Sequence, residues 1–180
     1  RLSPEPVERL TALVALTSFD DLVALLATLR RRIGPSLCAF EAMWDGYFEC
    51  AIATTGSARP FSERHAFYAL VEMESLDGAA DRARLESVLS EVLDGGTARD
   101  AIIASSLHES ARLWRIRECA GEVIGRLAPA ATYDISLPLG RMEGFVESLR
   151  RSSERLRADR PFLVFGHLGE GNLPLLVALR

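Results

Sequence analysis

The sequence contains no lysine, because all 21 of its basic residues are arginine. Lysine forms the Schiff bases of carbonyl and pyridoxal-phosphate enzymes, and it is the residue that contacts the phosphates in a P-loop. The absence of lysine therefore excludes these three kinds of chemistry.

Positive charge is not concentrated anywhere along the chain either. The net charge is −4, and the arginines are scattered or accompanied by acidic residues in segments of helical period. A nucleic-acid-binding domain needs a basic patch or stripe. We therefore expect no nucleic-acid partner.

Cysteine is scarce, and Cys38, Cys50 and Cys119 do not have the spacing of metal ligands. An odd number of widely separated cysteines is typical of a reducing compartment. We therefore expect buried thiols, no disulfide framework and a cytoplasmic location.

Long apolar runs are missing as well. Apolar residues make up 48% of the chain, but no window is apolar over the ~18 residues that a membrane-spanning helix needs. A chain of 180 residues can form one sizeable core or two small ones. It runs from Arg1 to Arg180 and stops directly after a strand-like segment. We expect one soluble domain, residues 1–180, excised from a longer protein.

Short apolar runs alternate with segments of helical period along the whole chain. Strands are expected at 10–16, 38–43, 65–74, 101–106, 133–139, 161–169 and 172–179, and helices at about 19–33, 85–94, 108–127 and 142–156. Ser18 is expected to cap the first helix, with Asp21 in its first turn. The segment 44–64 is less regular. A parallel α/β sheet is one reading, but polar loops follow several helices and the end resembles a hairpin. We predict an α+β fold, with helices packed on one face of an antiparallel sheet in ferredoxin-like units.

The stretch "FGHLGEGNLPLL" (165–176) places a histidine and an acid among three glycines. The order G-x-x-G-x-G differs from the dinucleotide-binding order and leads into a strand, so it is weak support for a Rossmann site. Glycines allow a tight turn or a close approach to a ligand. From spacing alone, a hairpin turn with His167 buried in the core is as good an interpretation as a functional site.

Arg117 lies on or beside the apolar face of its expected helix, four residues after Leu113. A guanidinium in that position needs a partner. One candidate is a nearby carboxylate, such as Glu118 or Asp134, and the other is the carboxylate of a substrate. Arg115 points away from this face and is expected to be solvated.

Three motifs change the balance between these alternatives. The stretches "LWRIRE" (113–118), "YDISLPL" (133–139) and "FGHLGEGNLPL" (165–175) resemble, in order and in separation, the C-terminal domain of FAD-linked oxidases. This family includes D-lactate, glycolate and D-2-hydroxyglutarate dehydrogenases. "LCAFEAM" (37–43) and "FYALVEME" (67–74) are similar to two strands of the same family. The resemblance covers essentially the whole chain.

The resemblance implies that a separate N-terminal domain binds FAD and that this chain is the cap that completes the substrate site. Arg117 would bind the substrate with Tyr133, and His167 would be the catalytic residue that orients or polarises the substrate hydroxyl. The glycine turn would pass close to the flavin. Its residues would contact the cofactor: Gly169, Glu170, Gly171 and Asn172.

The same resemblance assigns a divalent metal to the first histidine of the turn motif, which is His167 here. The second histidine ligand of the family is replaced by Pro174, and the third would lie beyond residue 180. Polar substrate contacts of the 2-hydroxyglutarate enzymes are replaced by Gly121, Thr132 and Leu176. We therefore expect no tightly bound zinc and a more apolar substrate.

Two functions of different classes follow from the resemblance. In the first, the parent protein is an enzyme that oxidises a small 2-hydroxy acid by hydride transfer to FAD. The electron acceptor is unknown, a homodimer is left open, and the fragment alone is inactive. Arg117 then awaits the substrate, so its removal is expected to cost little stability. In the second, a degenerate cap acts as a binding or assembly module of a flavoprotein complex.

Overall fold

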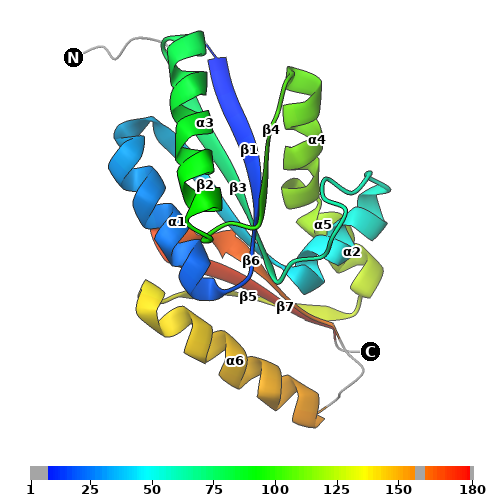
Figure 1. Cartoon of the computed structure of the whole chain (residues 1–180). Helices are drawn as coiled ribbons and strands as arrows, with labels where there is room; N and C mark the ends of the chain where they lie inside the picture. Colours follow the sequence, from blue (N-terminus) through cyan, green and yellow to red (C-terminus); the bar gives the residue numbers. More distant parts are fainter. Residues whose placement is uncertain (1–7, 157–160, 179–180) are drawn as a thin grey trace, which may run out of the picture.

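The computed structural model describes residues 8–156 and 161–178. Its strands form one seven-stranded sheet in the order β4-β1-β3-β2-β6-β7-β5, and every pair of neighbours is antiparallel. Figure 1 shows the sheet between two groups of helices, with a further helix, α6, below it. The predicted α+β class with an antiparallel sheet is confirmed, and the parallel alternative is wrong.

Apart from one helix inserted between its second and third strands, the first half of the chain has the ferredoxin-like order β-α-β-β-α-β, which brings four strands together as β4-β1-β3-β2. Its elements are β1 (Glu8–Leu16), α1 (Phe19–Arg32), β2 (Leu37–Trp44), β3 (Phe67–Ser75), α3 (Gly78–Asp94) and β4 (Asp100–Ile103). Ser18 caps α1 as expected. Its hydroxyl accepts from the Asp21 backbone at 3.1 Å, while the Asp21 carboxylate accepts from the Ser18 backbone at 3.0 Å.

The second half extends the same sheet beyond β2. Its strands are β6 (Phe162–His167), β7 (Asn172–Ala178) and β5 (Ala130–Ser136), with α6 (Leu139–Leu156) between β5 and β6. The turn η2 (Leu168–Glu170) joins β6 to β7, so the two final strands form the predicted hairpin. A pairing of β2 with β6 connects the two halves.

Helices cover both faces of the sheet. Because successive side chains of a strand point to opposite faces, Leu10, Ala12 and Val14 of β1 pack with α1 and α3, while Leu13 and Ala15 pack on the other side. The other side is covered by α2 (Asp45–Thr55), α4 (Leu107–Glu118) and α5 (Ala120–Leu127). The expectation that helices pack on one face of the sheet is right for α1 and α3, which share a face. It is corrected for the whole domain, because other helices cover the second face.

Two expectations about helices are also corrected. The irregular segment 44–64 contains α2, which buries Tyr47, Phe48 and Ala51 and ends at Gly56 with a φ of 64°. The helix expected at 108–127 is two helices that meet at Cys119. The apolar period continues across this break, and therefore the sequence alone does not reveal it.

The cysteines differ from the expectation of buried thiols, since only Cys119 is fully buried. Cys50 is partly buried and Cys38 is exposed. Cys38 lies where the pairing of β2 with β3 shifts register between Leu37 and Ala39, which turns it toward an open cleft. Within the described ranges, no helix is long and apolar enough to cross a membrane.

Candidate functional site

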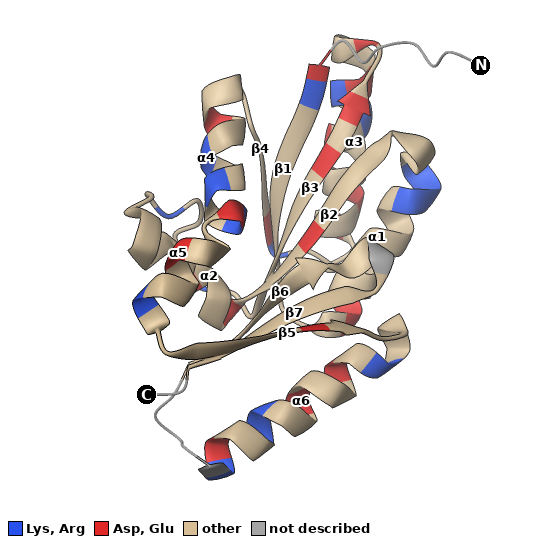
Figure 2. Cartoon of the chain, turned by 180° about the vertical axis from the view of Figure 1, so that it is seen from behind, with Lys and Arg blue, Asp and Glu red and all other residues tan. Residues whose placement is uncertain are grey.

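A cleft of about 760 Å³ opens beside strands β2 and β3 and reaches the turn after β6. Figure 2 shows acidic residues on β2 and β3, among strands that are otherwise mostly uncharged. Charged and aromatic side chains from five elements line the cleft, among them Arg30, Glu41, Glu72, Trp114, Glu118 and His167. Two of these, Glu41 and Glu72, are buried carboxylates, and a buried carboxylate needs partners.

Glu41 is held by two basic side chains. Its Oε2 atom accepts from Nε of Arg117 at 2.6 Å, and its Oε1 atom contacts Nδ1 of His167. The pairing of β2 with β6 places Glu41 directly opposite His167, and side chains opposite each other in an antiparallel pair are close neighbours. One carboxylate, with a side chain only 3% exposed, therefore joins the two residues expected to act on substrate.

Arg117 is paired with an internal acid, but not with either acid named from the sequence. Its partner is Glu41, and neither Glu118 nor Asp134 binds its guanidinium. The guanidinium carbon lies 4.8 Å from the ring centroid of Phe165, a cation–π distance. Among the described residues the Nη atoms make no hydrogen bond, while the side chain remains 12% exposed. Arg117 itself is not among the cleft-lining residues, whereas Glu41 is.

The signal for Glu41 was present in the sequence but was not recognised. It is the single charged residue in the otherwise apolar strand "LCAFEAMW". A lone acid at a position whose neighbours are buried indicates a partner elsewhere in the fold. Nothing in the sequence says that this partner lies 76 positions further along the chain.

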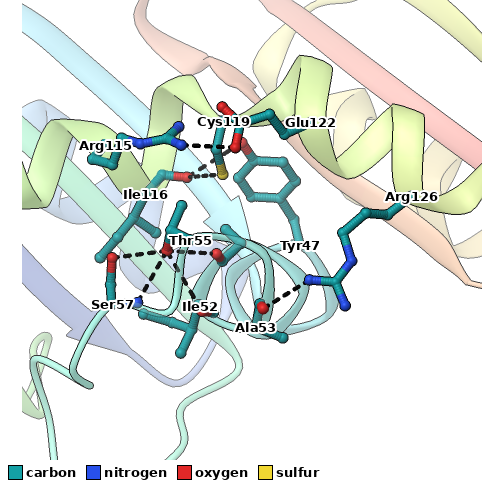
Figure 3. A network of polar contacts seen from close by, with 11 residues as sticks. Tyr47, Ile52, Ala53, Thr55, Ser57, Arg115, Ile116, Cys119, Glu122 and Arg126 are labelled. Atoms are coloured by element: carbon teal, nitrogen blue, oxygen red, sulfur yellow. Dashed lines mark hydrogen bonds and ion pairs between the residues drawn. The ribbon is translucent and has the colours of Figure 1, made fainter.

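The position of Arg117 depends on α2, the helix that the sequence did not reveal. The Tyr47 hydroxyl donates to the backbone carbonyl of Arg117 at 2.8 Å, next to the break at Cys119. Figure 3 shows Tyr47 reaching from α2 toward this break, with Cys119 donating to the Ile116 carbonyl at 3.2 Å. Burial raises the pKa of Tyr47 and of Cys119. Both groups therefore stay protonated and can donate to carbonyls at the end of α4 that have no partner within the helix.

His167 is half exposed and lines the cleft, so it is not a core histidine. The glycines on either side of it have distinct structural reasons. Gly166 has a φ of 153°, and a Cβ there would lie 2.5 Å from Pro174 and 2.7 Å from the Asn172 carbonyl. Gly171 has a φ of 74°, which favours glycine. Arg30 of α1 donates to the Gly169 carbonyl at 2.5 Å and fixes the turn against the rest of the domain.

The remaining residues expected at the site are more dispersed. Gly169 lines the cleft, and Asn172 begins β7 opposite Ser136. The side chain of Glu170 lies outside the described part of the structure. Tyr133 is 55% exposed on the outer strand β5 and does not line this cleft.

The expectation of no tightly bound zinc depends on the surroundings of Pro174 and His167. Pro174 pairs with Asp134 across β5 and β7, and its ring packs against Gly166 where the family places a histidine. In the ranges 8–156 and 161–178, no group of three or more His, Cys, Asp or Glu side chains is arranged to hold a metal ion. Nδ1 of His167 contacts Glu41.

The other buried carboxylate, Glu72, lies on β3 with different partners. Its Oε1 atom accepts from Nε1 of Trp114 at 2.8 Å, and its Oε2 atom accepts from Arg9 at 3.1 Å. The Cys38 thiol lies beside it, and burial together with the Glu72 charge raises the pKa of Cys38 to about 11. No local pattern in the sequence indicates that these residues meet.

The chain matches the family model "FAD linked oxidases, C-terminal domain" over residues 5–180. It is 31% identical to the mitochondrial D-2-hydroxyglutarate dehydrogenase of Arabidopsis thaliana over 168 residues, which are 93% of this chain and 30% of that protein. The D-2-hydroxyglutarate dehydrogenase of Xanthomonas citri pv. viticola is 31% identical over 177 residues, which are 98% of this chain and 36% of that protein. The chain thus spans about a third of the length of these relatives.

Solved structures share the fold at low sequence identity. An alkyldihydroxyacetonephosphate synthase aligns with a TM-score of 0.69 and 10% identity, over 97% of this chain and 37% of that chain. A p-cresol methylhydroxylase aligns with a TM-score of 0.61 and 9% identity, over 99% and 40%. The low identities show a shared fold alone, whereas the family model matches nearly the whole chain. The chain belongs to the family of FAD-linked oxidase C-terminal domains, as the motifs indicated.

Proposed function

We propose that this chain is the substrate-facing cap of a flavin-dependent enzyme that oxidises a small 2-hydroxy acid. The observation that carries the proposal is the cluster of Arg117, Glu41 and His167, which holds a guanidinium and an imidazole on one buried carboxylate at the cleft. A 2-hydroxy acid presents a carboxylate and a neighbouring hydroxyl. These are the two groups that a guanidinium and an imidazole can bind.

The carboxylate of the substrate is assigned to Arg117. One edge of its guanidinium is bound to Glu41 through Nε, which leaves the Nη atoms to donate. The planar, always charged guanidinium suits a carboxylate better than a point charge does. Phe165, under the guanidinium carbon, and Tyr47, stacked on Phe165 at 4.2 Å, hold its plane in place.

The hydroxyl of the substrate is assigned to His167. Its Nδ1 atom faces Glu41, so Nε2 is the nitrogen that remains for the substrate. As the hydrogen on C2 leaves with its electron pair, Nε2 takes the hydroxyl proton and the product is a 2-oxo acid. Bound FAD would supply the acceptor of that hydride.

The residues of this chain fit the edge of a flavin site and not a whole one. The turn from Gly169 to Asn172 offers backbone without side chains at both of its glycines, and Gly171 has little room for a Cβ, 3.2 Å from the Leu137 carbonyl. FAD would be held mainly by an N-terminal domain outside this chain. We propose that Gly169, Glu170, Gly171 and Asn172 contact the cofactor and that Tyr133 contacts the substrate from β5.

The test uses the full-length parent protein. It should purify as a yellow flavoprotein and reduce a dye acceptor with at least one member of a panel of 2-hydroxy acids. His167→Asn should slow flavin reduction by roughly 100-fold or more without loss of flavin, and Arg126→Ala, remote from the cleft, is the matched control. A parent protein that never takes up FAD would contradict the proposal.

A second candidate is a cap that binds or assembles without chemistry. It is favoured by one observation: Pro174 fills the space beside Gly166 where a histidine ligand is expected, and Gly121, Thr132 and Leu176 replace polar contacts. The two functions separate in the same experiment. A parent that binds FAD but shows no flavin reduction with any 2-hydroxy acid is a module of the second kind.

A further inference from the structure

We propose that Glu41 is a positioning residue that fixes the tautomer of His167 and couples it to Arg117. The proposal rests on the proposed function for its consequence in catalysis, but its geometric part stands on the contacts alone. The motifs that indicated the site assign no role to Glu41.

The first step concerns the proton on His167. An ionised carboxylate has only acceptor atoms, and both oxygens of Glu41 are engaged by basic side chains. The contact between Oε1 of Glu41 and Nδ1 of His167 therefore requires the proton to be on Nδ1. In the neutral imidazole the lone pair is then on Nε2, the nitrogen directed away from Glu41.

The second step concerns why Glu41 keeps this arrangement. Its side chain is 3% exposed, so water cannot replace a lost partner. Oε2 is occupied by Arg117 at 2.6 Å, and the strand pairing sets Glu41 opposite His167. Each oxygen therefore has one fixed partner, and the carboxylate cannot exchange them without moving α4 or β6.

The third step is a consequence that distinguishes a carboxylate from an amide. In Glu41→Gln, Arg117 still has to donate, so the single amide oxygen must face Arg117. The amide NH₂ group then faces His167 and donates to Nδ1. The proton of the neutral imidazole then moves to Nε2. Nε2, the nitrogen directed away from Glu41, can no longer accept a proton from a substrate. Glu41→Asp keeps two acceptor oxygens and should keep the native tautomer.

The experiment is a long-range ¹H–¹⁵N correlation spectrum of this chain, labelled with ¹⁵N on histidine and recorded at a pH where the ¹⁵N shifts themselves show a neutral ring. The chain has three histidines, and His167→Gln identifies the signal of interest. We expect the Nδ1–H tautomer in the native chain and the Nε2–H tautomer in Glu41→Gln. Glu72→Gln, which changes the other buried carboxylate of the same cleft, is the matched control and should leave the tautomer as it is.

The outcomes separate the two proposals. An Nε2–H tautomer in the native chain overturns the role of Glu41 without any substitution, even if Glu41→Gln does not fold. A native tautomer that persists in a folded Glu41→Gln overturns it as well. In the full-length flavoprotein, Glu41→Gln should reduce the rate of flavin reduction by roughly 100-fold or more at unchanged flavin content, while Glu41→Asp retains more of the rate. If the tautomer behaves as expected and the native parent reduces no flavin, the proposed function fails and the positioning role stands.

Discussion

The two buried carboxylates of the cleft have similar burial but very different partners. Glu72, on β3, is bound by the neutral indole of Trp114 and by Arg9, whose side chain is 59% exposed. Glu41, on β2, is bound by Arg117, which is 12% exposed, and by the half-exposed His167. Glu72 thus connects β3 to α4 and β1. Glu41 instead contacts two basic side chains whose remaining nitrogen atoms, Nη of Arg117 and Nε2 of His167, are not used by Glu41. Burial does not distinguish these two acids, and our proposal for Glu41 depends on the chemistry of its partners.

The largest effect on stability is expected when Arg117, the main partner of Glu41, is removed. Arg117→Ala leaves the Glu41 charge buried without its main partner, and breaking a buried ion pair costs about 3–5 kcal/mol. Chemical denaturation of this chain measures the loss in the free energy of unfolding. From the sequence, Arg117 was expected to await a substrate without an internal partner, so that its removal would cost little stability. Because the structure pairs Arg117 with Glu41, a large loss of stability is now expected.

Two variants control that measurement. Arg115→Ala removes an exposed arginine whose partner is Glu122 and should leave the free energy of unfolding essentially unchanged. The double variant Arg117→Met with Glu41→Leu removes both charges and should recover much of the lost stability. If Arg117→Ala is as stable as the native chain, the buried pair contributes nothing and the comparison fails.

At the Glu72 end the expected effect is smaller. Trp114→Phe keeps an aromatic ring but removes the Nε1 donor that lies 2.8 Å from Glu72. Hydrogen bonds to charged groups contribute about 1.5–3 kcal/mol, and Arg9 remains to bind the carboxylate. The same denaturation experiment should show a loss within that range, with the tautomer of His167 unchanged. A loss as large as that of Arg117→Ala would mean that the two ends are not energetically distinct.

The reactivity of the Cys38 thiol measures the environment of Glu72 without a substitution that changes stability. Partial burial of its sulfur and the Glu72 charge raise its pKa from 9.0 to about 11, so near pH 8 its thiolate fraction should be roughly 100-fold below that of an unperturbed thiol. Alkylation of Cys38 should therefore be slow although the residue is exposed. The stabilisation from a protonated thiol is complete below pH 9 and is lost as the pH rises through about 11.

Glu72→Gln sharpens this measurement, because it removes one of the causes of the raised pKa. Alkylation of Cys38, followed by mass spectrometry of the labelled peptide, should become faster in this variant. Cys38 labelling as fast as that of free cysteine in the native chain would contradict the assigned environment.

The smallest expected effect is that of a divalent metal. By the family resemblance Pro174 stands at a ligand position, and His167 already contacts Glu41. Zinc added to this chain should therefore leave its melting temperature unchanged, and elemental analysis after dialysis should find far less than one zinc per chain. Near-stoichiometric zinc would overturn the metal-free interpretation of His167. Pro174→His should raise zinc affinity only in the full-length parent.

Local sequence determined much of the fold. A continuous apolar run specifies β1, and β-branched, aromatic and alternating residues specify β3. The Ser18 capping box specifies the start of α1, and the glycines around His167 specify the final hairpin. These features depend on residues a few positions apart, where geometry follows directly from the chain. The motifs that resemble FAD-linked oxidases likewise identified the family from the residues alone.

Tertiary structure alone decided which charges meet. Glu41 and Arg117 are 76 positions apart, and they meet because α4 packs on β1 and β3, and β3 lies next to β2 in the sheet. Helix α2 also escaped prediction, since its buried residues are Tyr47, Phe48 and Ala51 and its amphipathic pattern is weak. Its Tyr47 nonetheless holds the end of α4 that carries Arg117. A buried charge is stable only with a partner, and the sequence does not encode in any local pattern which long-range contact supplies it.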